Sequence, residues 1–177
     1  RGDWIETAAV EGTVEEIGVA TTKLRTFANS VQTIPNRLLA DQPITNWSKM
    51  RIRRIKMLIG VEYRTTGAQL EKIVSDILAY LENNPEIAQP KNSKAKLMVH
   101  LAEFASSSVN IDLYYFTKTT NWQEWRRIKH ENMLEFMKIV EKNGAAFAFP
   151  SQSIYVEQLP EEPEKKSVGK KVKENNA

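Results

Sequence analysis

The sequence predicts a mixed α+β protein: a small all-β domain of the Sm-like barrel type, then a ferredoxin-like βαββαβ domain, then one C-terminal oligomerisation strand. The first 47 residues contain short alternating runs rich in β-branched residues, separated by turn residues and without a helical period. The next hundred alternate in the order strand, helix, strand, strand, helix, strand, which is the split βαβ arrangement. We therefore expect a β domain at 1–47, an α/β domain at 48–150, a barrel strand at 151–158 and a disordered basic tail at 159–177.

Four strands are expected in the first domain, near residues 3–7, 8–19, 20–27 and 31–35. Gly12 and Gly18 interrupt the long second run, and we expect them to mark bulges or sharp bends where a barrel-like sheet turns its corner. The Ala-Asn-Ser sequence at 28–30 predicts a hairpin connection between the third and fourth strands.

The second domain opens with a strand and a helix. Apolar residues alternate strictly along the strand, at Ile55, Met57, Ile59, Val61 and Tyr63. The helix is predicted from apolar residues at helical spacing between Leu70 and Leu81, and Thr66 with Gln69 forms a plausible capping box at its start.

A polar loop at 86–96 leads to two more predicted strands, at 97–104 and 109–117. Asn121 should cap the second helix, which Gly144 ends. Its expected apolar face consists of Trp122, Trp125, Met133, Phe136, Met137 and Val140. A last short strand at 146–149 would close the sheet.

An isolated alternating strand follows Pro150, with Ile154, Tyr155 and Val156 at its centre. A lone strand leaves backbone donors and acceptors unpaired, so it either joins a sheet edge or pairs with copies of itself in other subunits. Beyond residue 159 the chain is rich in Pro, Glu, Lys and Asn with few apolar residues, which predicts disorder.

Composition excludes several classes of protein. The 177 residues carry a net charge of +3 and no cysteine, which removes disulfides, thiolate catalysis and cysteine-based zinc sites. No window approaches the roughly 18 to 20 apolar residues of a membrane-spanning helix. The chain begins at Arg1 without a leader, and we interpret it as a piece of a longer protein.

No pattern points to catalysis, a cofactor or a metal. His100 and His130 have no spacing relation to each other or to an acidic pair. A phosphate-binding glycine loop and a nucleophile elbow are both missing from the sequence. Tryptophans and basic residues occur together between Trp122 and Lys129, as they do in sites that bind single-stranded nucleic acid. The same sequence is expected of an ordinary helix whose tryptophans pack inward and whose arginines face solvent.

A set of short motifs in a fixed order carries a resemblance: Ile34-Pro35-Asn36, Asn46-Trp47-Ser48-Lys49, Arg53-Arg54, Ile59-Gly60-Val61-Glu62-Tyr63 and Phe149-Pro150-Ser151-Gln152. Together they resemble the signature of the small-conductance mechanosensitive ion channel family, over about residues 1 to 158. The loop at 86–96 and the tail match nothing in that signature. We expect structural roles for the motif residues Ile34, Pro35, Asn36, Asn46, Ser48, Gly60 and Pro150.

The resemblance implies the soluble cytoplasmic side of a channel in the inner (plasma) membrane, whose transmembrane helices lie outside this chain. It implies a homo-heptamer in which the β domains form a ring beneath the pore and the ferredoxin-like domains wall a vestibule. Ile154, Tyr155 and Val156 would then belong to a barrel of seven parallel strands. Under membrane tension, in hypo-osmotic shock, inorganic ions and small osmolytes would leave through side portals, with no cofactor, nucleic acid or enzymatic step.

Arg53, Arg54 and Lys56 are the candidate portal or vestibule residues, because they begin the first strand of the second domain, close to where the family places its portals. Alternate members would face the vestibule and raise the local concentration of anions. The alternative interpretation is that these three residues only form a basic, solvent-exposed end of the strand. The alternative function is an RNA-binding module, since small β barrels and ferredoxin-like sheets both host RNA binding, although strand 109–117 lacks the usual glycine and aromatic signature.

Overall fold

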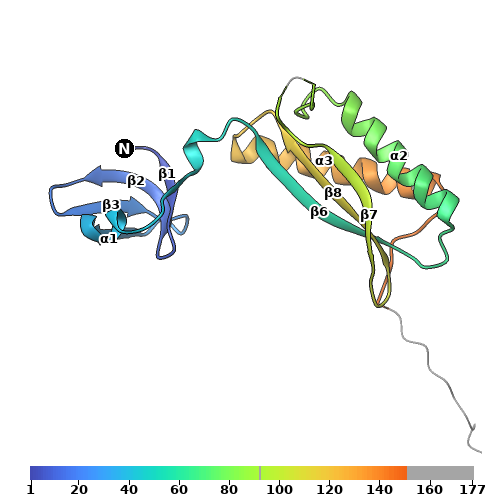
Figure 1. Ribbon diagram of the computed structural model, residues 1–177, viewed down its shortest axis with the longest axis horizontal. Helices are drawn as coiled ribbons and strands as arrows, with labels where there is room; N and C mark the ends of the chain where they lie inside the picture. The colour runs from blue at the N-terminus through green and yellow to red at the C-terminus, as the bar shows by residue number, and fades with distance from the viewer. Residues whose placement is uncertain (92, 151–177) are drawn as a thin grey trace, which may run out of the picture.

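Two bodies make up the computed structural model, which describes residues 1–91 and 93–150 (Figure 1). The first, the β body, contains β1 (Trp4–Glu6), β2 (Glu11–Ile17), β3 (Thr21–Arg25), β4 (Val31–Pro35), α1 (Asn36–Ala40), β5 (Thr45–Asn46) and a 3-10 turn (Trp47–Lys49). The second, the α/β body, contains β6 (Arg53–Val61), α2 (Gly67–Asn83), β7 (Met98–Phe104), β8 (Val109–Thr117) and α3 (Trp122–Lys142). The predicted α+β class, with a β unit before a ferredoxin-like unit, is confirmed. The expected C-terminal strand and tail lie outside the described residues.

The β body is one antiparallel sheet in the strand order β4-β3-β2-β1-β5. The hairpin between β3 and β4 is confirmed: Asn29 takes a φ of 64°, and the Thr26 amide donates to the Ser30 carbonyl at 2.9 Å. The bulge lies between Val14 and Glu16 and not at Gly12, whereas Gly18 does begin the turn between β2 and β3, where its amide donates to the Thr21 carbonyl at 2.9 Å. A Cβ on Gly12 would lie 2.6 Å from the Arg25 carbonyl oxygen, so this glycine permits a close backbone approach.

The α/β body has a three-stranded antiparallel sheet in the order β6-β8-β7, with both helices on one side of it (Figure 1). The expected fourth strand at 146–149 is not formed. It is reduced to one bridge between Val61 and Phe147, flanked by backbone hydrogen bonds from Glu62 to Ala146 and from Ala148 to Gly60. Phe147 is the one large apolar residue of the Ala145–Ala148 segment, and it packs against the core together with Ala145.

The helix α2 forms as predicted. Thr66 and Gln69 make the capping box, in which the Thr66 hydroxyl accepts from the Gln69 amide and the Gln69 side chain accepts from the Thr66 amide. Its core-facing side consists of Leu70, Ile73, Ile77 and Leu81. These residues pack with the inward faces of β6 and β8 in a single hydrophobic cluster.

The inward face of α3 agrees with the prediction at Trp125, Phe136 and Val140 and differs from it elsewhere. Its buried residues are Ile128, Asn132, Phe136 and Val140, whereas Trp122, Met133 and Met137 are about half exposed. Asn132 can be buried because it donates to the Tyr115 hydroxyl at 3.1 Å and accepts from the Tyr80 hydroxyl at 2.9 Å. Tyr63 also departs from expectation: β6 ends at Val61, and the Tyr63 ring is exposed.

The polar stretch after α2 contributes to the core. Ile87 is fully buried and forms a bridge with Thr117, and its neighbour Ala88 donates a backbone hydrogen bond to Phe116. No helix within residues 1–91 and 93–150 has the length and apolarity needed to cross a membrane.

Candidate functional site at the junction of the two bodies

The first motif ties α1 to the turn between β2 and β3. The Asn36 side-chain amide donates to the carbonyls of Gly18 at 2.9 Å and Val19 at 3.0 Å, while its oxygen accepts from the Thr22 hydroxyl at 2.7 Å. Only a carboxamide offers two donors and an acceptor in this arrangement, so the position requires asparagine. The structural role expected for Asn36 therefore has a physical basis in these three bonds.

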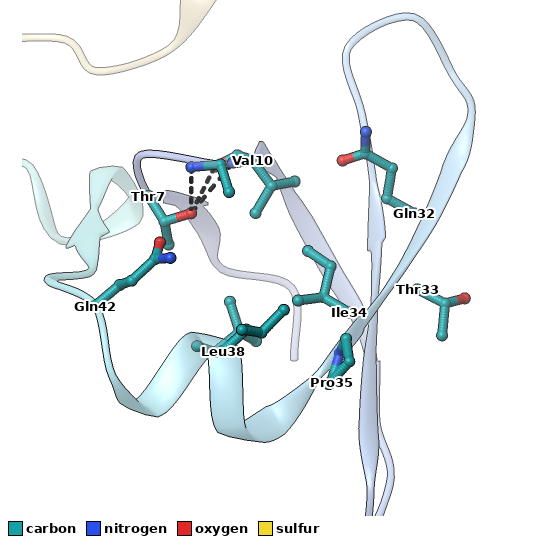
Figure 2. A pocket seen from close by; sticks show the side chains of 10 residues that line it. Thr7, Val10, Gln32, Thr33, Ile34, Pro35, Leu38 and Gln42 are labelled. Atoms are coloured by element: carbon teal, nitrogen blue, oxygen red, sulfur yellow. Dashed lines mark hydrogen bonds between the residues drawn. The ribbon is translucent and has the colours of Figure 1, made fainter.

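Pro35 is the last residue of β4 and precedes the first turn of α1. Since β4 is an edge strand of the sheet, a residue without an amide proton is tolerated here. Figure 2 shows the adjoining hollow, with Ile34, Pro35 and Leu38 on one side and the Thr7 to Val10 turn on the other. Its volume is about 340 Å³, and Leu38 lies half exposed at its rim.

The second motif fastens the segment between the bodies to β1. Asn46 donates to the Asp3 carboxylate at 3.0 Å, the Trp47 indole donates to Glu6 at 2.7 Å, and the Ser48 hydroxyl accepts from the Trp4 amide at 2.8 Å. Each bond reaches back about forty residues, so the turn at 47–49 is fixed to the β body before β6 begins.

Arg53 lies where the chain enters the α/β body, and three indole rings surround it. Its guanidinium carbon is 5.3 Å from the ring centre of Trp4, 4.7 Å from that of Trp122 and 5.2 Å from that of Trp125. Its Nη1 donates to the Thr120 carbonyl at 3.1 Å, and burial lowers the pKa of the guanidinium. Among the described residues, no carboxylate lies within ion-pair distance of it.

The other two portal candidates lie on the opposite face of β6. Arg54 and Lys56 are exposed and alternate with Arg53, Ile55 and Met57, which face the helices. Only the backbone of Arg54 is engaged, since its carbonyl accepts from the Trp125 indole at 3.2 Å. The strand therefore separates one enclosed basic residue from two solvated ones.

The last two motif positions are Gly60 and Pro150. A Cβ on Gly60 would lie 3.1 to 3.2 Å from atoms of Ser108 and Asn110, so the β6–β8 pair leaves little room there for a side chain. Pro150 is exposed and is the last residue that the structure describes. Ile154, Tyr155 and Val156 lie outside the described residues.

The tryptophan cage around Arg53 was not predicted as a unit, because the sequence pattern assigned Trp122 and Trp125 to the apolar face of the helix. The strand alternation nevertheless indicates that Arg53 needs partners. Arg53 shares the period of Ile55, Met57 and Ile59, which places a charged residue on an inward face where it needs aromatic or polar partners. No pattern in the sequence around Arg53 or around Trp4 predicts that the Trp4 ring, from the other body, contacts Arg53.

Chemically, the junction can bind and orient, but it has no catalytic constellation. Within residues 1–91 and 93–150, no group of three His, Asp or Glu side chains is arranged to hold a metal ion. His100 lies on β7 and His130 on α3, on separate elements. The carboxylates near Arg53 accept hydrogen bonds from indole N–H groups: Glu6 accepts from Trp47, and Glu11 accepts from Trp4 at 3.1 Å.

Two family models match the chain. The model for the mechanosensitive ion channel beta-domain matches residues 1–49, and the model for the C-terminal domain of the MscS mechanosensitive ion channel matches residues 55–147. Together they span both bodies and leave out the short segment between them.

Curated relatives agree with the family models. An uncharacterized MscS family protein of Helicobacter pylori is 43% identical over 91% of this chain and 30% of its own length. The low conductance mechanosensitive channel YnaI of Escherichia coli is 40% identical over 89% of this chain and 45% of its own length. The chain thus spans less than half the length of these relatives.

Solved structures share the fold. Arabidopsis thaliana MSL1 superposes with a TM-score of 0.77 at 25% identity, over 84% of this chain and 52% of that one. The closed state of Helicobacter pylori MscS gives a TM-score of 0.72 at 22% identity, over 90% and 59% of the two chains.

Proposed function

This chain belongs to the MscS family of mechanosensitive ion channels, and we propose that it forms the vestibule of such a channel on the cytoplasmic side of the inner membrane. In this proposal the complete protein opens under membrane tension and releases ions and small osmolytes during hypo-osmotic shock. The match of both bodies, in order, to two consecutive channel domains carries the proposal. The chain itself would act without catalysis, as a wall and a filter around the permeation path.

The test requires the full-length protein, because the chain covers only 30 to 45% of its relatives. Electrical recording from a membrane patch under suction should show openings that increase with tension, in cells that lack their own mechanosensitive channels. The same cells should survive dilution into low-osmolarity medium better than cells that carry an empty vector. A protein that gives no tension-dependent current would contradict the proposal.

We further propose that seven copies assemble, with Ile154, Tyr155 and Val156 contributing to a closed barrel. The β body supports assembly because large apolar side chains remain exposed on a small domain: Ile17, Val19, Phe27, Val31, Leu38 and Ile44. Light scattering on the full-length protein in detergent should give a mass near seven protomers. A monomer would overturn this part of the proposal.

Arg53, Arg54 and Lys56 remain the proposed portal group, and the exposure of the last two makes them the sharper test. Glutamate at both Arg54 and Lys56 should weaken any anion preference, because the summed field of the strand end changes sign. The reversal potential under a salt gradient measures this. Glutamate at both Lys72 on α2 and Lys142 on α3, which are exposed, is the charge-matched control, and an equal shift in the control would discard the portal assignment.

The RNA-binding alternative receives no support from the matched families, which describe channel domains for both bodies. A salt-sensitive mobility shift with single-stranded RNA would nevertheless favour it over the vestibule.

A further inference from the structure

Few contacts besides the chain itself join the two bodies. The strands of the β body pack against one another and against the 47–49 turn, while β6, β7, β8 and the two helices pack among themselves. Among the hydrogen bonds, ion pairs and aromatic contacts of the described residues, only the contact of Arg53 with the Trp4 ring joins β1–β5 to β6–α3.

Arg53 is held firmly on the side of the α/β body. It stacks near Trp122 and Trp125, whose rings lie 5.2 Å apart and nearly parallel, and it donates to the Thr120 carbonyl. A planar guanidinium can contact several ring faces at once while its in-plane N–H groups still donate, which an ammonium cannot do. The α/β body by itself therefore supplies three contacts that position the guanidinium.

Trp4 is held equally firmly on the side of the β body. Its ring lies edge-on to Phe27 at 5.3 Å and tilted by 30° against Trp47 at 5.5 Å, and its indole nitrogen donates to Glu11. The Arg53–Trp4 contact consequently links two pre-arranged groups rather than two mobile side chains.

A hollow of about 780 Å³ lies beside this contact, lined from both bodies by Trp4, Glu11, Phe27, Arg53, Thr120 and Trp122. A small interface between two domains leaves relative motion as the default expectation. The cation–π contact is the one cation–π, aromatic, hydrogen-bond or ion-pair contact that crosses the junction among the described residues, so it can limit that motion.

We propose that Arg53 is a positioning residue that locks the orientation of the β body relative to the α/β body through Trp4. If the proposed vestibule function holds, this contact transmits movement of the β ring to the vestibule wall. The lock itself is a property of the chain and does not depend on channel activity.

Double electron–electron resonance on the 177-residue chain tests the lock directly. The sequence has no cysteine, so Gln32→Cys on β4 and Glu71→Cys on α2 place one spin label on an exposed site of each body. When this doubly labelled chain is diluted into an excess of the unlabelled, cysteine-free chain, so that distances between subunits do not contribute, we expect a single narrow distance distribution. Arg53→Gln and, separately, Trp4→Leu should each broaden it at least twofold, because each removes one side of the contact.

Conservative variants separate positioning from general stability. Trp4→Phe keeps an aromatic face and should retain most of the narrow distribution, and Arg53→Lys keeps a cation and should give an intermediate width. Arg54→Gln is the matched control, because Arg54 is exposed on the other face of β6, and it should leave the width unchanged. Thermal unfolding monitored by circular dichroism verifies that every variant is folded.

A distribution of unchanged width in folded Arg53→Gln or in folded Trp4→Leu would overturn the lock. If Arg53→Gln does not fold, Trp4→Leu decides by the same criterion. Because no current is measured, a failed lock leaves the channel proposal standing, and a chain that is no channel can still show the lock.

Discussion

The β body and the α/β body reach stability by different means. In the β body the buried apolar cluster consists only of Ile5, Val10, Val14 and Leu24. In the α/β body sixteen buried apolar residues from β6, α2, β7, β8, α3 and the loop at Ile87 form one core. The larger core can hold its body together alone, whereas the smaller one relies on side-chain clamps such as Asn36 and on neighbouring surfaces.

The largest effect should come from opening the core of the α/β body. Leu113 is fully buried on β8, so Leu113→Ala should lower the free energy of unfolding by about 2–5 kcal/mol through lost burial and a residual cavity. Urea unfolding followed by far-ultraviolet circular dichroism measures it. Leu58→Ala on β6, where the side chain is 54% exposed, is the control and should change stability by less than about 0.5 kcal/mol. Equal losses would mean that the core is not the main support of this body.

A pair of glycine substitutions should separate the bodies by the sign of the effect. Gly12→Ala in β2 forces a methyl group against the Arg25 carbonyl and should destabilise the β body by about 1–3 kcal/mol. Gly67→Ala at the start of α2 meets open space and should stabilise the α/β body by about 0.4–1 kcal/mol. Hydrogen exchange measured by mass spectrometry can assign each change to its body. If both substitutions changed the free energy of unfolding in the same direction, the proposed difference between the two bodies would be wrong.

An effect similar in size to that of Gly12→Ala should come from the Asn36 side chain, which clamps α1 to the turn between β2 and β3. Asn36→Ala removes the bonds to Gly18, Val19 and Thr22 and should cost about 1–2 kcal/mol. Faster amide exchange should be confined to residues 18–22 and α1. Asn36→Asp keeps the acceptor for Thr22 and loses both donors, so its effect should be intermediate. Faster exchange that extends into β8 would show that the bodies are more strongly coupled than one contact allows.

Periodicity predicted the elements whose own residues determine them. The alternation of β8 and the helical spacing of α2 are both strong, and the capping box at Thr66 fixed the start of α2. Short elements lacked enough residues to show a period: α1 has five residues and β5 has two. Propensity over so few positions is a weak signal, because helices of this length depend on tertiary contacts.

The errors in α3 and at the junction have one cause, which is pairing between residues distant in the sequence. Asn132 is polar and was not expected in the core, but hydroxyls from Tyr80 and Tyr115 satisfy it. That shifts the inward side of the helix away from Met133 and Met137. Arg53 is likewise enclosed by Trp4 from the other body, so its partner depends on how the two bodies dock.

The incomplete fourth strand has a consequence for how the channel proposal should be tested. The Arg54 carbonyl accepts from the Trp125 indole, and residues 60–62 bond to the Ala146–Ala148 segment. Between these two points no described strand pairs with the outer edge of β6, so that stretch can accept a strand from another chain. Charged side chains along such an edge discourage unwanted sheet extension, and Arg54 and Lys56 carry that charge here. Replacing them with valine or threonine would invite aggregation and could be mistaken for a loss of conduction, whereas glutamate keeps the protection while it reverses the field.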